Sequence, residues 1–343
     1  MPRFRHVAAA TAAALALAAP ATATAQTSPP YDDAGYWAFA DRMQQRLDRL
    51  WDDDAGYYRG GGGGVEPMTN ALMLLTHSVA AMEGHEGAAR NDRRARRLAA
   101  RLVSGPPYVT RRTGAGQTHA PGFTNSMTSA RATQHLVFDA EVVDGLVFAY
   151  RARRALDLPE STVSALRAAI SRTARGSFWR YPTIRLNQIN WYALMYAADA
   201  TVTGDPTLLR RDFRLQLLRF VRGARANFGP GMRFHYLPHE HLNHPMNVDS
   251  AEYANIVLSF TRFYTQARRA GMAAMPAEHK RLIQQWVARA IAGYWTHAGY
   301  NNWDSGLGFD RWHQAKKFGL TQQALIGIAS APTLAPGARW TRW

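Results

Sequence analysis

The 343-residue chain contains no cysteine. Disulfide bonds, zinc–thiolate sites and cysteine nucleophiles are therefore excluded, and a folded chain must gain its stability from packing. Lysine is nearly as scarce, because all but three of the 41 basic residues are arginine. Acidic residues number only 25, so the formal net charge is +16. Such a balance favours anionic partners, among them acidic polysaccharides.

Long apolar runs are also missing. After residue 26 no stretch approaches the roughly 20 apolar residues of a membrane-spanning helix, so we expect no membrane span. Before it, Arg3 and Arg5 precede the short apolar run Val7–Ala19, and small residues follow at Ala23 and Ala25. This pattern is typical of a secretory signal peptide. We expect residues 1–25 to be removed on export and residues 26–343 to form a single secreted domain, extracellular or in the cell envelope.

Strand-type alternation is scarce, whereas helical periodicity runs through the chain. Helices with one apolar stripe are predicted at 37–51, 90–103, 161–175, 206–224 and 276–292. They alternate with helices that are apolar nearly all round, at 68–82, 138–156, 189–202, 250–266 and 318–329. A helix apolar on all sides is enclosed, and a striped helix faces solvent. The pattern predicts an all-α fold, an (α/α)-toroid, complete or incomplete, of about five to six helical hairpins; an open α-solenoid is the alternative.

The links between these helices are of two lengths. Short links, at 83–89, 157–160, 204–205 and 268–275, lead from apolar to striped helices. Long links, at 104–134, 178–188, 227–249 and 297–317, lead back to the apolar ones. In a ring of antiparallel helices all links of one kind lie at the same end. Since sites are commonly built from long loops on a rigid scaffold, we expect the functional site on the rim formed by the long links.

The long links and the residues just after them hold most of the 12 histidines together with many Asn, Trp and Tyr residues. Aromatic faces stack on sugar rings, while amides, carboxylates and imidazoles bind hydroxyl groups. We therefore predict a cleft for a polysaccharide or oligosaccharide. The predicted substrate-binding residues are Asn187, Trp191, His135, His239, His241, Asn247, Tyr300, Asn302, Trp303, Asp304, Trp312 and His313.

The segment Leu186–Tyr192 places Asn187, Asn190 and Trp191 at the start of a predicted apolar helix. In this it resembles the α/α-toroid polysaccharide lyases of the alginate- and hyaluronate-lyase type, here without an adjacent His. The resemblance implies that His244 and Tyr253 match the His and Tyr of a later inner helix. Lyase chemistry removes a proton α to a uronate carboxylate, so that carboxylate must be neutralised and a base supplied. Arg185 and Asn190 would neutralise it, and His244 and Tyr253 would transfer protons.

Two alternatives remain. A glycoside hydrolase on the same toroid needs two carboxylates, for which Asp249 and Glu252, Asp139 and Glu141, or Asp304 and Asp310 are available. Asp249 and Glu252 also have the spacing of a helix capping box. An exported glycan-binding protein without turnover would show the same aromatic rim.

The stretch 235–244 contains four histidines and a glutamate, which are suitable ligands for a divalent metal. His235, His239 and His241 are the candidate ligands, although histidines in such a loop also bind substrate directly. We expect no other cofactor. Nucleic acid is not an expected partner, because the basic residues are spread over outer helices without a recognised binding module. The sequence predicts neither the particular polymer nor the oligomeric state.

Overall fold

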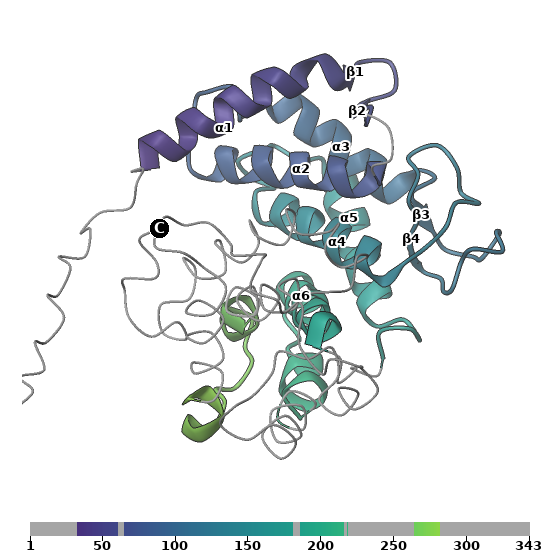
Figure 1. Ribbon diagram of the computed structural model, residues 1–343, viewed down its shortest axis with the longest axis vertical. Coiled ribbons are helices and arrows are strands. Elements are labelled where there is room, and N and C mark those ends of the chain that lie inside the picture. Colours follow the sequence, from purple (N-terminus) through teal and green to yellow (C-terminus); the bar gives the residue numbers. More distant parts are fainter. Residues whose placement is uncertain (1–32, 61–64, 181–185, 216–217, 219–263, 282–343) are drawn as a thin grey trace, which may run out of the picture.

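The computed structural model describes residues 33–60, 65–180, 186–215, 218 and 264–281 (Figure 1). Most of these residues are helical, as predicted. The helices are α1 (Asp33–Leu47), α2 (Glu66–Met82), α3 (Asp92–Ser104), α4 (Leu136–Arg151), α5 (Glu160–Ala174) and α6 (Leu186–Thr203). A single 3-10 turn, Asp48–Leu50, follows α1, and a π-helical segment, Leu208–Phe213, follows α6. No helix in the described part of the chain is long and apolar enough to cross a membrane.

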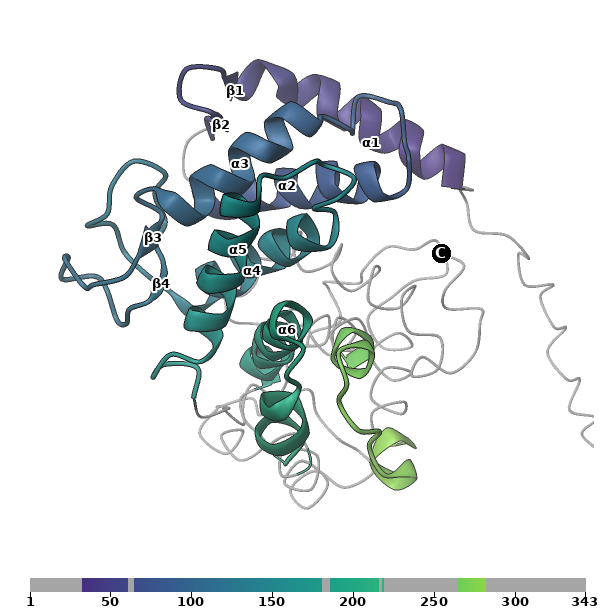
Figure 2. The same ribbon diagram turned by 180° about the vertical axis from the view of Figure 1, so that it is seen from behind.

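The described helices form two layers. Helix α4 packs between α2 and α6, while α3 and α5 pack against each other and against this row (Figures 1 and 2). Helix α4 is buried on all sides from Asp139 to Val147, and the inner helix α2 buries a broader face than the outer helices do. The outer helix α3 buries only one face, with Leu98 and Leu102 at its centre. Complete burial of one such leucine contributes about 1.5–3 kcal/mol. The predicted alternation of enclosed and striped helices is therefore confirmed from α2 to α6.

Helices α2 and α4 cross at very short range. A Cβ atom built on Gly145 of α4 would lie 2.4 Å from the carbonyl oxygen of Ala71 on α2. No side chain fits into that distance. The glycine at position 145 therefore allows the two inner helices to approach this closely.

The segment between α1 and α2 is a small hairpin. Strand β1 (Trp51–Asp52) pairs antiparallel with β2 (Tyr57–Tyr58), with Trp51 opposite Tyr58. The hairpin explains why α1 ends at Leu47 instead of the predicted residue 51, because Trp51 pairs with the neighbouring strand. The side-chain oxygen of Asp52 accepts a hydrogen bond from the amide of Ala55 (2.7 Å) and closes the turn.

A buried network joins α1, β2, α2 and α3. The Tyr58 hydroxyl lies 2.9 Å from Nε2 of His77, whose Nδ1 lies 2.7 Å from the carbonyl oxygen of Ala89. Since only a protonated Nδ1 can donate to that carbonyl, Nε2 of a neutral His77 accepts from the tyrosine. The same hydroxyl accepts from Gln44 (2.9 Å) and Arg94 (3.1 Å). Burial raises the pKa of Tyr58 and lowers the pKa of His77.

The boundaries of two helices differ from the predicted ones for local reasons. Helix α5 begins at Glu160 after Pro159, which has an extended backbone, and no side chain caps this end. Helix α4 ends at Arg151, five residues earlier than predicted, and the chain continues in turns to Asp157, whose φ is +49°.

Candidate functional site

Two long links meet at one carboxylate, that of Asp139 in the first turn of α4. From the link 104–134, Nε2 of His119 lies 2.5 Å from Oδ2 of Asp139, and the amide of Phe123 donates to Oδ1 (2.6 Å). From the link that precedes α6, Nε1 of Trp179 donates to Oδ2 (2.8 Å). The Asp139 side chain is 0 % exposed. A carboxylate that water does not reach needs hydrogen-bond donors from the protein. Here three donors from two links bind it.

The first link is shaped to bring His119 to this carboxylate. Strands β3 (Tyr108–Val109) and β4 (Gly122–Phe123) pair antiparallel within it. The side-chain oxygen of Gln134 accepts from the His119 amide (3.1 Å). A Cβ atom on Gly122 would lie only 2.5 Å from Nε2 of His119, so a residue without a side chain is needed beside the imidazole. Nδ1 of His119 lies 2.8 Å from Oγ1 of Thr118, an exposed residue.

Aromatic rings continue from this centre into α6. Phe178 stacks on His119 with a centroid distance of 4.3 Å and an interplanar angle of 12°. Trp179 meets the ring of Tyr192 edge-on at 4.8 Å. The Tyr196 hydroxyl donates to the carbonyl oxygen of Trp179. Burial raises the pKa of Tyr192 to about 12 and also raises the pKa of Tyr196. Both tyrosines therefore stay protonated at neutral pH, and their role in this cluster is packing.

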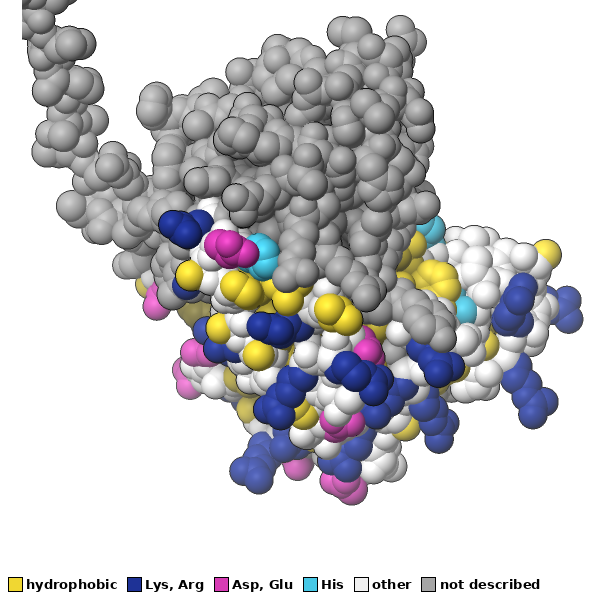
Figure 3. Space-filling view, turned by 90° about the horizontal axis from the view of Figure 1, so that it is seen from below, with side chains coloured by type: hydrophobic (Ala, Val, Ile, Leu, Met, Phe, Trp, Pro, Cys, Tyr) yellow, Lys and Arg dark blue, Asp and Glu magenta, His cyan; other side chains and the backbone are white. Residues whose placement is uncertain are grey.

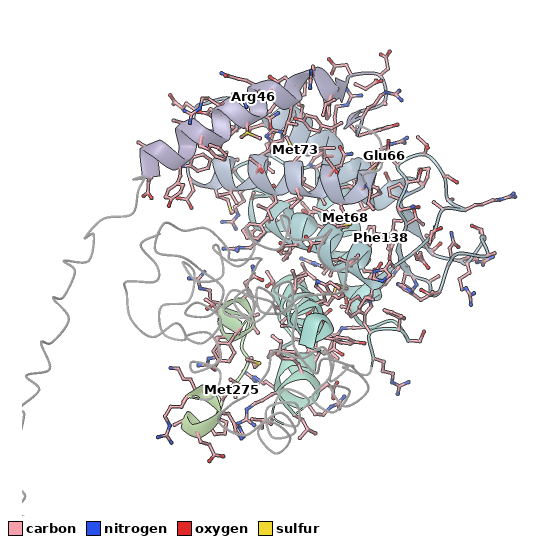
Figure 4. The ribbon with its side chains drawn as sticks, viewed as in Figure 1. Arg46, Glu66, Met68, Met73, Phe138 and Met275 are labelled. Atoms are coloured by element: carbon pink, nitrogen blue, oxygen red, sulfur yellow. The ribbon has the colours of Figure 1, made fainter. Side chains whose placement is uncertain are left out.

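The start of a third inner helix lies at the same end. The carboxylate of Glu66, the first residue of α2, accepts from the amide of Met127 in the link 104–134 (3.3 Å). In Figure 4, Glu66, Met68 and Phe138 lie at the same end of the α2–α4 pair. The first turns of α2 and α4 and the link that enters α6 are thus joined by hydrogen bonds. The two long links that the structure describes, wholly or in part, therefore meet at one end of the described helices.

Four of the predicted binding residues fall within the described helices or beside them. His135 is exposed and caps α4, its Nδ1 accepting from the amide of Val137 (3.2 Å). Trp191 is half-buried on α6 and packs against the core. Asn187 and Asn190 lie in the first turns of α6. These four residues thus lie at or near the starts of two neighbouring helices, α4 and α6.

The other predicted residues lie outside the described part of the chain. They are Arg185, His235, His239, His241, His244, Asn247, Asp249, Glu252, Tyr253, Tyr300, Asn302, Trp303, Asp304, Trp312 and His313. The histidine-rich stretch 235–244 is among them, so the metal prediction stays a prediction. Within the described ranges no three His, Asp or Glu residues are grouped as a metal site would require.

Sequence reasoning named Asp139 as a possible hydrolytic carboxylate but did not join it to His119, and it gave Trp179 no role. One signal was present: an aspartate in the first turn of an otherwise apolar helix must find donors when it is buried. The structure also changes the interpretation of Asp139 and Glu141 as a hydrolytic pair. With three donors on Asp139 and no solvent access, that carboxylate is a structural anchor and is not available as an acid or a nucleophile.

Comparison with protein-family models, with curated proteins and with solved structures finds no match to this chain.

Proposed function

We propose that the protein is a secreted enzyme that cleaves an acidic polysaccharide, with its catalytic cleft on the rim where the long links converge. The observation that carries this proposal is the junction at Asp139. It holds two long links rigidly at the start of two enclosed helices, beside the positions of Asn187, Asn190 and Trp191. Rigid placement of loop residues is what a catalytic site requires.

The reaction that we propose is β-elimination at a uronate residue. A base, His244 or Tyr253, takes the C5 proton; the electron pair forms the C4–C5 double bond, and the C4–oxygen bond breaks. The departing oxygen receives a proton, for which the Tyr253 hydroxyl is suited. Arg185 and Asn190 neutralise the carboxylate while negative charge develops on it. Asn190 lies on the described helix α6, so its backbone is held by the buried part of that helix.

The charge of the rim supports an acidic substrate. The sequence contains no Asp or Glu from Ser104 to Phe138 and none from Ser161 to Ala198, two ranges that include both described long links. A surface without carboxylates favours the binding of a polymer that itself carries carboxylates.

A hydrolase that uses Asp249 and Glu252 is the second candidate. In the described part of the rim, the carboxylates of Asp139 and Glu66 are both engaged by backbone or side-chain donors, which leaves the hydrolase dependent on residues 227–249 and beyond. A glycan-binding protein without turnover is the third candidate, supported by the aromatic residues of the rim alone.

The experiment is to incubate the purified protein with alginate, polygalacturonate, hyaluronate and neutral dextran and to follow ultraviolet absorbance and new reducing ends together. β-Elimination produces both signals, since the new double bond is conjugated to the carboxylate. Hydrolysis produces reducing ends alone, and a binding protein produces neither. Tyr253→Phe removes one hydroxyl and is expected to abolish elimination, while Asp249→Asn and Glu252→Gln are expected to leave it measurable. The reverse pattern would assign the reaction to the hydrolase. A chelator in the same assay tests the proposed metal ligands His235, His239 and His241.

We further propose that the hairpins close into an (α/α)-toroid and that residues 1–25 direct export. The inner row α2–α4–α6 and the outer pair α3–α5 support the ring, because each further hairpin would continue the same two layers. N-terminal sequencing of the protein recovered from culture medium tests the leader: a mature chain that begins near residue 26 supports it, and one that begins at Met1 refutes it.

A further inference from the structure

The link 104–134 carries three exposed arginines on two adjacent stretches of chain. Arg111 and Arg112 lie on one stretch and Arg131 on the other, and all three side chains are exposed. The two stretches are in contact, since a Cβ atom on Gly114 would lie 2.4 Å from the carbonyl oxygen of Arg131. Among the described residues, none of the three arginines forms an ion pair.

Some arginines elsewhere on the described surface are paired instead. Arg93 lies 2.8 Å from Asp53, and Arg175 lies 2.9 Å from Asp199, a fully buried acid. On that part of the surface positive charge is offset locally. In Figure 3, Asp and Glu side chains lie among the Lys and Arg side chains over much of the described surface, but none is visible at the right-hand edge. The β3–β4 link lies at that edge in Figure 1.

The stretches that carry the three arginines are held together by a buried glutamine. The Gln117 side chain, 1 % exposed as a residue, accepts from the amide of Thr113 (2.7 Å) and donates to the carbonyl oxygens of Ala130 (2.6 Å) and Ala132 (3.2 Å). The Thr113 hydroxyl also donates to the Ala130 carbonyl (2.9 Å). The arginines therefore project from a fixed frame, so less conformational entropy is lost when their side chains bind.

The frame is connected to the anchor of the rim. Two and six residues after Gln117, His119 and Phe123 bind the Asp139 carboxylate at 2.5 and 2.6 Å. The position of the arginine-bearing stretches is thus set by the same carboxylate that holds Trp179 and the entry to α6.

We infer that Arg111, Arg112 and Arg131 form a binding site for a carboxylated polysaccharide, distinct from the residues proposed to be catalytic. This identification of the ligand rests on the proposed function. Guanidinium groups suit the task because each donates two parallel hydrogen bonds to a carboxylate.

The test is a binding measurement on the full chain. Wild-type protein and the triple variant Arg111→Gln/Arg112→Gln/Arg131→Gln are run in native gels that contain alginate or polygalacturonate, with neutral dextran as reference. The matched control replaces three exposed arginines of α1 and the turn after it, Arg42→Gln/Arg46→Gln/Arg49→Gln, and so removes the same charge. Arg46 lies on α1, well away from the β3–β4 link (Figure 4). Circular dichroism verifies that both variants are folded.

The link variant is expected to bind the carboxylated polymers about tenfold more weakly, and the control variant less than about twofold. The difference should shrink at high salt, since exposed charges are screened. Equal losses in the two variants, or no loss in the link variant, would overturn the inference. Tighter wild-type binding to single-stranded DNA or to phosphatidylglycerol vesicles than to the uronates would also overturn it. The product assay is separate: a protein that binds as expected but forms no product refutes the enzyme and leaves the binding site standing.

Discussion

The indole N–H of Trp179 donates to Oδ2 of Asp139 over 2.8 Å, and this bond joins the link before α6 to the first turn of α4, 40 positions earlier in the chain. His119 and the amide of Phe123 share the same carboxylate. Asp139→Asn keeps the shape of the side chain but replaces one acceptor oxygen with an amide NH2 group, which cannot accept a hydrogen bond. One buried donor then loses its acceptor, and the unfolding free energy should fall by about 1–3 kcal/mol.

Urea denaturation followed by tryptophan fluorescence measures this loss. The control is Asp54→Asn, an exposed residue of the β1–β2 turn, for which a change within about 0.5 kcal/mol is expected. Equal stability of the Asp139 and Asp54 variants would show that the junction is not an anchor.

Gly145→Ala tests the crossing of α2 and α4. The new Cβ would be 2.4 Å from the Ala71 carbonyl oxygen, so the two helices must separate, and a loss of about 1–3 kcal/mol is expected. Gly60→Ala is the control, because its Cβ would meet nothing closer than 3.7 Å. Thermal melting compares the two. If the Gly145 variant melts with or above the wild type, the close approach is not required.

His77 makes stability depend on pH. Burial lowers its pKa in the folded state, with the positive charge of Arg94 acting in the same direction, so the folded protein favours the neutral imidazole. The unfolded chain binds a proton near the ordinary pKa of about 6.5. His77 therefore contributes its full stability above that pH, and stability falls as the pH drops below it, by at most about 1.4 kcal/mol per pH unit.

The measurement is urea denaturation between pH 7.5 and about pH 5, for the wild type and His77→Gln. The variant should be less stable at pH 7.5, since the bonds to Tyr58 and Ala89 are altered, but it should lose less stability on acidification. Subtracting the pH dependence of the variant's stability from that of the wild type cancels the contributions of the other histidines. Parallel slopes would mean that His77 binds protons equally in the folded and unfolded chain over this range, and that folding does not lower its pKa.

Helix α1 carries an exposed apolar stripe that tests ring closure. Tyr36, Phe39 and Met43 are 48, 53 and 38 % exposed and are spaced for one face of a helix. Helix α1 precedes the first inner helix, and 318–329 is the last inner helix that the sequence predicts. In a closed toroid these two helices would therefore pack together and cover the stripe.

The absence of cysteine allows a direct test. Met43→Cys is combined with single cysteines at successive positions of 318–329, and each pair is oxidised. A disulfide forms readily only where the two Cα atoms approach within about 7 Å. Closure predicts cross-links that recur every three to four residues, and the control Ala155→Cys in place of Met43→Cys should give none. A scan without intramolecular cross-links would favour the open solenoid, and cross-linked dimers would assign the stripe to a second copy of the chain.

Much of the fold could be predicted, because the helices of a two-layer protein differ in how far apolar residues extend around them. The enclosed character of α4 and α6 and the single stripes of α3 and α5 follow from that pattern. Helix ends were harder, since they depend on local competition: Trp51 ends α1 by pairing with Tyr58. At the site, loop lengths predicted that the links converge. The pairing of Asp139 with Trp179 could not be read from the sequence, because it depends on how α4 and α6 pack.

The shared carboxylate of Asp139 also determines how the rim opens. If either link detaches, the buried carboxylate loses a donor and the stack of His119 on Phe178 is broken, so the two links should open together as one cooperative unit. In amide exchange, the Phe123 amide and the Trp179 indole should report the same opening free energy, although they belong to different loops. A substrate that binds one link would then slow exchange in both.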